Sequence, residues 1–142
     1  MKLIFSLKNL DVFNKRMEKR LRNDALKEVK KNVTYGTNIV ENFAKEKIQR
    51  SPATGNPRGD GSFASAPGEF PKTDTGFLVQ NISSKVFTRG NTVIGQIISS
   101  APYSKHLEFG TTKMAARPFM QPSLEANAKK IERRFKRGGY ID

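Results

Sequence analysis

The chain has a single histidine, His106, and a carboxylate, Glu108, stands two residues after it. A histidine paired with a carboxylate is a usual arrangement for general acid–base catalysis. Residues 103–109 have the pattern of a short helix, however, and side chains two residues apart on a helix point away from each other. The chain has no cysteine and no second histidine, so it offers no recognisable nucleophile–base set or metal-ligand spacing. The sequence therefore predicts a protein that is not an enzyme and holds no metal or cofactor.

The residues around His106 are better explained as a structural corner. Gly110 permits the chain to turn after the short helix, and Pro118 favours extended backbone at Arg117. Two roles for Glu108 stay open, since it can accept a charge-assisted bond from Arg117 or cap neighbouring backbone N–H groups. We expect a phenylalanine on each side of the turn to act as an apolar anchor. The predicted corner comprises Tyr103, Glu108, Phe109, Gly110, Thr111, Arg117, Pro118 and Phe119.

Hydrophobic periodicity places this corner between a β-hairpin and a last helix. Residues 82–99 are rich in β-branched side chains on either side of a turn at Gly90, which predicts a hairpin. Residues 122–137 carry apolar positions three and four apart, which predicts a C-terminal helix, and residues 2–8 alternate as a strand does. These elements predict an α+β fold with helices packed on a small antiparallel sheet of three or four strands.

Residues 11–50 have the pattern of one long N-terminal helix. From Leu26 to Phe43 apolar positions recur at steps of three and four, which is a heptad seam. An unbroken helix of this length would span roughly 60 Å, more than a domain of this size covers with its own sheet. We therefore expect either a bend at residues 34–37, where β-branched residues and a glycine lower helix propensity, or packing of part of the helix on another subunit.

A segment rich in glycine, proline and serine, residues 51–76, follows the long helix. Loops of this length without secondary structure are uncommon in compact domains and are usually functional or disordered. The tripeptide Arg-Gly-Asp at 58–60 matches a cell-adhesion signal, but three residues carry little specificity and a turn explains them better. The sequence predicts a long loop or arm here.

The formal net charge is +13, from 26 Lys and Arg against 13 Asp and Glu. Such an excess favours an acidic partner, either nucleic acid or an acidic protein, although a basic surface that only aids solubility gives the same count. The chain has no tryptophan, which disfavours base stacking of the kind that single-strand binders use. No apolar run is long enough to span a membrane, and 142 residues are most simply one domain, residues 1–142.

A series of short motifs occurs in a recognisable order. A Pro-Gly-rich segment precedes Thr-Gly-x-Leu, a hairpin follows, and then come Tyr, Glu-Phe-Gly-Thr and an Arg-Pro-Phe that opens the last helix. The residues are Pro67, Gly68, Pro71, Thr75, Gly76, Leu78, Asn81, Ile82, Tyr103, Glu108, Phe109, Gly110, Thr111, Arg117, Pro118 and Phe119. This order resembles the small tail-completion or neck proteins of long-tailed bacteriophages, described as minor tail components. The resemblance covers residues 67–135, and the N-terminal helix matches only in general character.

The resemblance implies a structural virion protein, made in the cytoplasm of the bacterial host and without enzymatic activity. It implies a ring, most simply six-fold, at the head–tail junction or the tail end. The implied partners are other copies of the chain, neck or connector proteins and tail-tube proteins, with transient contact to genomic DNA in the channel and none to a membrane. Residues 51–76 would then be the arm between subunits or rings, and the interface residues would be Arg58, Phe63, Phe70, Thr75 and Gly76.

A second hypothesis explains the same charge without a ring. The chain would be a basic, non-specific DNA-binding module that contacts phosphates through the lysines and arginines of the long helix and the last helix.

Overall fold

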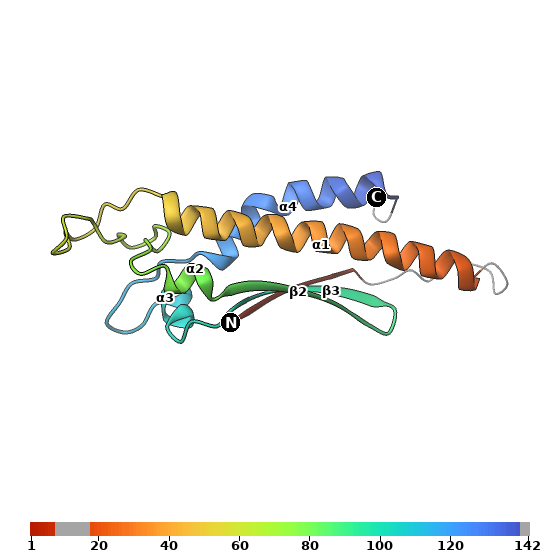
Figure 1. The fold of residues 1–142 in the computed structure, drawn as a ribbon, viewed down its shortest axis with the longest axis horizontal. Helices are drawn as coiled ribbons and strands as arrows, with labels where there is room; N and C mark the ends of the chain where they lie inside the picture. The colour runs from red at the N-terminus through yellow and green to blue at the C-terminus, as the bar shows by residue number, and fades with distance from the viewer. Residues whose placement is uncertain (8–17, 140–142) are drawn as a thin grey trace.

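The computed structural model describes residues 1–7 and 18–139. The elements in these residues are β1 (Lys2–Leu7), α1 (Glu18–Arg50), α2 (Phe77–Gln80), β2 (Ile82–Arg89), β3 (Thr92–Ser99), α3 (Ser104–Phe109) and α4 (Met120–Arg137). The predicted α+β architecture is confirmed, with the two long helices and a three-stranded antiparallel sheet. Figure 1 shows an elongated molecule in which α1 runs along one face of the sheet.

Several element bounds differ from those predicted. α4 begins at Met120, two residues before the predicted start at Pro122, because a side chain from another helix caps its first turn (described below). α3 begins at Ser104, one residue after the predicted start. The start that we predicted for the long helix, at residue 11, and the end of the first strand, Lys8, lie outside the described residues.

The sheet is a simple antiparallel ladder with β3 in the centre and the order β1-β3-β2. β2 and β3 pair from Ile82–Ser99 to Arg89–Thr92, which leaves a two-residue turn whose first residue, Gly90, has a φ of 59°. Side chains alternate between the two faces of a strand, so Val93 and Ile97 share the face toward α1 and are buried. Apolar residues of the sheet and of both long helices form a continuous core.

α1 is unbroken through the residues where we expected a bend. Thr37 is fully buried, and its hydroxyl donates to the carbonyls of Val33 and Thr34 within the helix, a bond that lets a threonine sit in a helix interior. The heptad seam faces the chain's own core, since Val29, Val33 and Val40 are all buried. The predicted bend is therefore wrong, and packing on another subunit stays a prediction.

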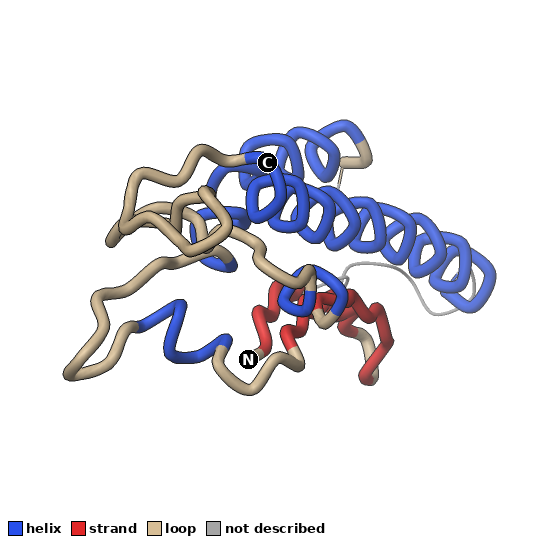
Figure 2. Tube along the Cα trace, turned by 60° about the vertical axis from the view of Figure 1, so that its left-hand side comes forward, coloured by secondary structure: helices blue, strands red, loops and turns tan. Residues whose placement is uncertain are grey.

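α4 packs along α1 on the side away from the sheet (Figures 1 and 2). Ile131 and Phe135 bury the apolar face of α4. Two polar side chains on the same face are also buried, and both donate hydrogen bonds within the helix: Ser123 to the carbonyl of Phe119 and Asn127 to the carbonyl of Ser123. Among the described helices, none combines the length and the hydropathy that a membrane crossing requires.

Candidate functional site

The carboxylate of Glu108 caps the first turn of α4. Glu108 lies in α3 and is only 6% exposed. Its Oε2 accepts the backbone N–H groups of Phe119 at 2.8 Å and Met120 at 3.0 Å, and its Oε1 accepts that of Gln121 at 2.8 Å. The N-cap residue of α4 supplies no side-chain cap of its own. A buried negative charge also suits the positive end of the helix dipole, so this one side chain joins α3 to α4.

Of the two roles left open for Glu108, the structure shows the backbone cap. Within the described residues Arg117 forms no bond to Glu108, and its Nε donates to the carbonyl of Ser65 at 2.9 Å instead. The backbone N–H of Arg117 donates to the carbonyl of Leu107 at 2.7 Å. Arg117 therefore ties the corner to loop 51–76.

Gly110 makes the turn of the corner possible. Its φ of 73° is positive, as expected for the end of α3, but its ψ of −178° differs from that of the left-handed helical stop that we predicted. A Cβ at this position would lie 2.9 Å from the backbone N of Ala116 and from the carbonyl O of Met114. The turn closes when Thr111 and Met114 exchange backbone hydrogen bonds, at 2.7 Å and 3.3 Å. Only glycine fits this backbone without strain.

The two phenylalanines of the corner have different environments. Phe119 is fully buried in the core and is the anchor that we predicted. Phe109 is 69% exposed, so the prediction that it anchors the turn is wrong. Glu108 and Leu107 of α3 face inward, which leaves the last residue of this short helix pointing to solvent.

Most of loop 51–76 lies on the body of the molecule. Phe70 packs against Phe43 of α1 with ring centroids 6.3 Å apart, and Pro71 is buried. The N–H of Gly68 donates to the carbonyl of Ala116 at 2.9 Å. Of the predicted loop or arm, residues 64–73 therefore form a loop on the body, and Phe70 belongs to the edge of the core rather than to a free arm.

Glu69 closes this part of the loop. Its carboxylate accepts the hydroxyl and the backbone N–H of Thr54, and also the backbone N–H of Ala66 at 2.7 Å. These bonds, with the Thr54 hydroxyl first, lower the pKa of Glu69 below its ordinary value. Nothing in the sequence singled out Glu69, because its partners lie up to 15 residues away within an irregular loop.

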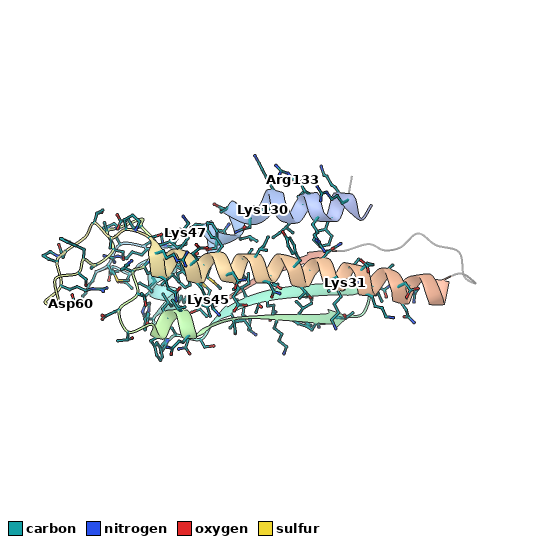
Figure 3. The ribbon with its side chains drawn as sticks, turned by 45° about the horizontal axis from the view of Figure 1, so that its top comes forward. Lys31, Lys45, Lys47, Asp60, Lys130 and Arg133 are labelled. Atoms are coloured by element: carbon teal, nitrogen blue, oxygen red, sulfur yellow. The ribbon has the colours of Figure 1, made fainter. Side chains whose placement is uncertain are left out.

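Residues 55–63 form the part of the loop that projects. Pro57 and Phe63 form an isolated antiparallel bridge, and Asp60 near the tip lies at the far end of the molecule (Figure 3). Arg58 folds back, with Nη1 3.8 Å from a carboxylate oxygen of Asp74. Asp60 accepts the N–H and the hydroxyl of Ser62, which lowers the pKa of Asp60. The Arg-Gly-Asp tripeptide thus forms the turn that we predicted.

Exposed aromatic rings gather at the same end of the molecule. Phe109, Phe63, Phe77 and Tyr103 are 69%, 50%, 45% and 41% exposed, and the rings of Phe77 and Tyr103 lie 6.1 Å apart. Phe77 and Tyr103 line a cleft of about 270 Å³, and its walls also include Arg58 and Arg117. Exposed apolar groups on this scale are typical of a protein–protein contact surface. We call these four exposed side chains, Phe63, Phe77, Tyr103 and Phe109, the aromatic end.

The predicted interface residues fall into different places around the aromatic end. Phe63 is part of it, whereas Arg58 braces the hairpin from inside. Thr75 is exposed, and Gly76, with a φ of 79°, starts α2 and so positions Phe77. Sequence reasoning did not place Phe77 at the interface, although it directly follows the Thr-Gly turn as the first residue of the one-turn helix α2.

The His106 side chain is exposed on α3, while the Glu108 carboxylate is directed to α4. Among residues 1–7 and 18–139, no three His, Asp or Glu side chains are grouped so that they could hold a metal ion. The described site consists of a rigid corner, a braced loop and an exposed aromatic surface, which is an arrangement suited to docking.

These features define a small α+β protein with a rigid corner and exposed aromatic side chains at one end, and one protein family matches the chain. The chain matches, over residues 11–110, the HK97-gp10-like family, described as "Bacteriophage HK97-gp10, putative tail-component". The chain belongs to this family and is thus a structural component of a phage tail, a part of the virion. The match includes the long helix, which our motif-based resemblance had covered only in general character. No curated protein and no solved structure matches the chain significantly.

Proposed function

We propose that copies of the chain assemble into a ring, most simply six-fold, at the head–tail junction or the tail end, and join the tail to the head connector. The aromatic end is the observation that carries this proposal. The four rings are between 41% and 69% exposed, and exposed aromatic side chains are enriched where proteins contact one another. In the proposed ring this surface docks on a neighbouring neck, connector or tail-tube protein, and the ring itself needs no chemistry.

The rigid corner supports the same proposal. Glu108 fixes the angle between α3 and α4, and Arg117 fixes loop 51–76 against α3. Phe109 and Tyr103 are therefore held on a stable support before any partner binds. A surface that is already ordered loses less entropy on association, so it binds more tightly than a flexible one.

The first turns of α1 extend beyond the sheet and provide the contact between copies in the proposed ring. The helix has 33 residues, about 50 Å at 1.5 Å per residue, whereas the eight-residue strands of the sheet span roughly 26 Å. Arg22, Asn23 and Asp24 are all exposed, and the first buried residue in the described part of the seam is Val29. In the proposed ring the first turns of α1 reach the next subunit.

The docking proposal is tested with two variants that leave the body intact. One is Phe63→Ser and the other is Phe109→Ser, each at an exposed side chain of the aromatic end. A deletion of residues 55–70 would be a poor test, because it also removes Glu69 and Phe70, which brace the loop on the body. Each variant is supplied in trans to a phage that lacks the gene, and joined particles are counted by electron microscopy.

We expect both variants to keep the melting temperature of the parent chain and to lose most joined particles. Lys113→Ser is the matched control, since Lys113 is an exposed residue of the same corner and bears no apolar surface. Normal numbers of joined particles with Phe109→Ser would refute the role of the aromatic end.

A further inference from the structure

A groove lies between α1 and α4, apart from the aromatic end. It has a volume of about 350 Å³. Its walls are Glu28, Asn32 and Tyr35 of α1, Lys130, Arg133, Arg134 and Arg137 of α4, and Gly138. Figure 3 labels Lys130 and Arg133 on α4, the helix that lies on the side of α1 away from the sheet. Four cationic side chains thus line one groove with a single carboxylate.

The carboxylates near the groove are already paired. Glu28 binds Lys31 at 2.6 Å, and Glu132, the next acidic residue of α4, binds Lys136 at 3.0 Å. Within the described residues, the four cations of the groove form no ion pair. Like charges this close repel one another, so the groove gains stability when an anion enters it.

Arg134 is held in place for a ligand. Its Nε donates to Oδ1 of Asn32 at 2.9 Å, and its guanidinium carbon lies 4.6 Å from the ring centre of Tyr35. Asn32 is only 7% exposed, so it is a fixed support. The bond uses one of the five N–H donors of the guanidinium, and a planar fork of this kind matches the oxygens of a phosphate.

The composition of the groove favours nucleic acid over an acidic protein as its anionic partner. Protein–protein interfaces have an apolar centre from which charges are depleted. Of the large apolar side chains that the structure shows exposed, only Tyr35 lies in the groove, and the other four form the aromatic end. Interfaces with nucleic acid are more polar and far more positive, as this groove is.

The spacing of the cations also fits a phosphate backbone. Lys130, Arg134 and Arg137 lie four and three residues apart, so they follow one face of α4 over roughly 10 Å. One strand of a DNA duplex rises about 3.4 Å per phosphate but also winds around the axis, so consecutive phosphates lie farther apart than this rise and the row can meet about two of them.

We propose that the groove between α1 and α4 binds the phosphate backbone of double-stranded DNA without reading its sequence. Contacts to so few phosphates are weak and sensitive to salt, which lets a duplex slide past the protein. The inference is independent of the proposed ring, because the groove is formed within one chain.

The test measures the affinity of the full chain for a random-sequence DNA duplex of about 20 base pairs over a range of salt concentrations. The groove variant is Lys130→Gln/Arg133→Gln/Arg137→Gln. The control variant is Lys85→Gln/Arg89→Gln/Lys105→Gln, which removes the same number of positive charges from exposed positions on β2 and α3. We expect the groove variant to lose at least about tenfold in affinity at low salt, and its slope of log Kd against log salt to fall by about 2, because Lys130 and Arg137 of the row are removed, while the control changes little.

A second probe separates DNA from acidic protein. Poly-glutamate with the same number of charges as the duplex should bind the parent chain at least about tenfold more weakly, since it lacks the phosphate spacing. Equal losses in the two variants would show that net charge alone binds DNA. Equal or tighter binding of poly-glutamate would assign the groove to an acidic protein. Either result would overturn the proposal, and an unchanged circular dichroism melt shows that each variant is folded.

Discussion

At the scale of single residues, the role of Glu108 decides how the corner is understood. Replacement with glutamine leaves one acceptor oxygen and sets an NH₂ group against backbone N–H groups. Because three hydrogen bonds to a charged group, two of them buried, are lost or weakened, we expect Glu108→Gln to lower the free energy of unfolding by roughly 2–4 kcal/mol. Urea denaturation measures this loss.

A control and a double variant sharpen that test. Glu125→Gln, at an exposed position of α4, should change stability by less than about 0.5 kcal/mol. Arg117→Met should also destabilise the fold, but additively with Glu108→Gln, because Arg117 binds Ser65. A coupling energy above about 1 kcal/mol would mean that the two side chains interact directly, contrary to the structure.

Gly110 is the second residue of the corner that we expect to tolerate no substitution without a loss of stability. Gly110→Ala places a Cβ 2.9 Å from two backbone atoms at a positive φ, so we expect a loss of roughly 2–4 kcal/mol. Gly59→Ala is the matched control, since nothing lies within 4 Å of its Cβ and its φ is not in the left-handed region. If Gly110→Ala had the same melting temperature as the parent chain, the described turn would be incorrect.

At the scale of elements, the Glu69 bonds make the ordering of loop 51–76 dependent on pH. The folded-state pKa of Glu69 is below its ordinary value of 4.5, so the bonds contribute their full stability to the loop above about pH 4.5. This contribution is lost as the pH falls through the lower, folded-state pKa. Amide hydrogen exchange of Thr54 and Ala66, measured by NMR, should therefore accelerate at acid pH.

Glu69→Gln provides the comparison for this titration. In that variant the two amides should be less protected at neutral pH, and their protection should lack the step at acid pH. A step of the same size in Glu69→Gln would assign the change to another carboxylate.

The elements themselves were largely predictable, and the contacts between distant elements were not. Periodicity identified the hairpin and both long helices, because each buries one face and so repeats with its own period. The bend expected near Gly36 was wrong. The low helix propensity of residues 34–37 destabilises the helix by less free energy than the burial of Val33 and Val40 contributes.

The site was harder to predict than the fold. The sequence indicated that Glu108 is important but did not show whether its carboxylate binds Arg117 or caps backbone N–H groups. That role depends on where the first turn of α4 lies relative to α3. Phe109 was misassigned because a six-residue helix is too short for its period to show which side is buried. Glu69 and Ser65 went unnoticed because their partners lie in irregular structure.

At the scale of the whole molecule, the chain carries two surfaces of different chemistry. The aromatic end offers exposed rings on a rigid support, and the groove between α1 and α4 offers cations that have no ion-pair partner in the described residues. A ring protein that contacts proteins through one surface and a duplex through the other needs this separation. Phe109→Ser should therefore impair docking but leave the affinity for a DNA duplex unchanged within about twofold, which the same salt-series binding assay measures.

The groove variant gives the reverse comparison. Lys130→Gln/Arg133→Gln/Arg137→Gln should weaken binding of the duplex and leave the number of joined particles near that of the parent chain. Loss of both properties in both variants would indicate one continuous surface.

The joining role itself is tested most directly by removing the gene. The phage that encodes this chain is made without it, and the lysate is examined by electron microscopy. We expect full heads and separate tails, with joining restored when the parent chain is supplied in trans. Normal numbers of joined, infectious particles from the deletion phage would contradict the proposed role at the junction.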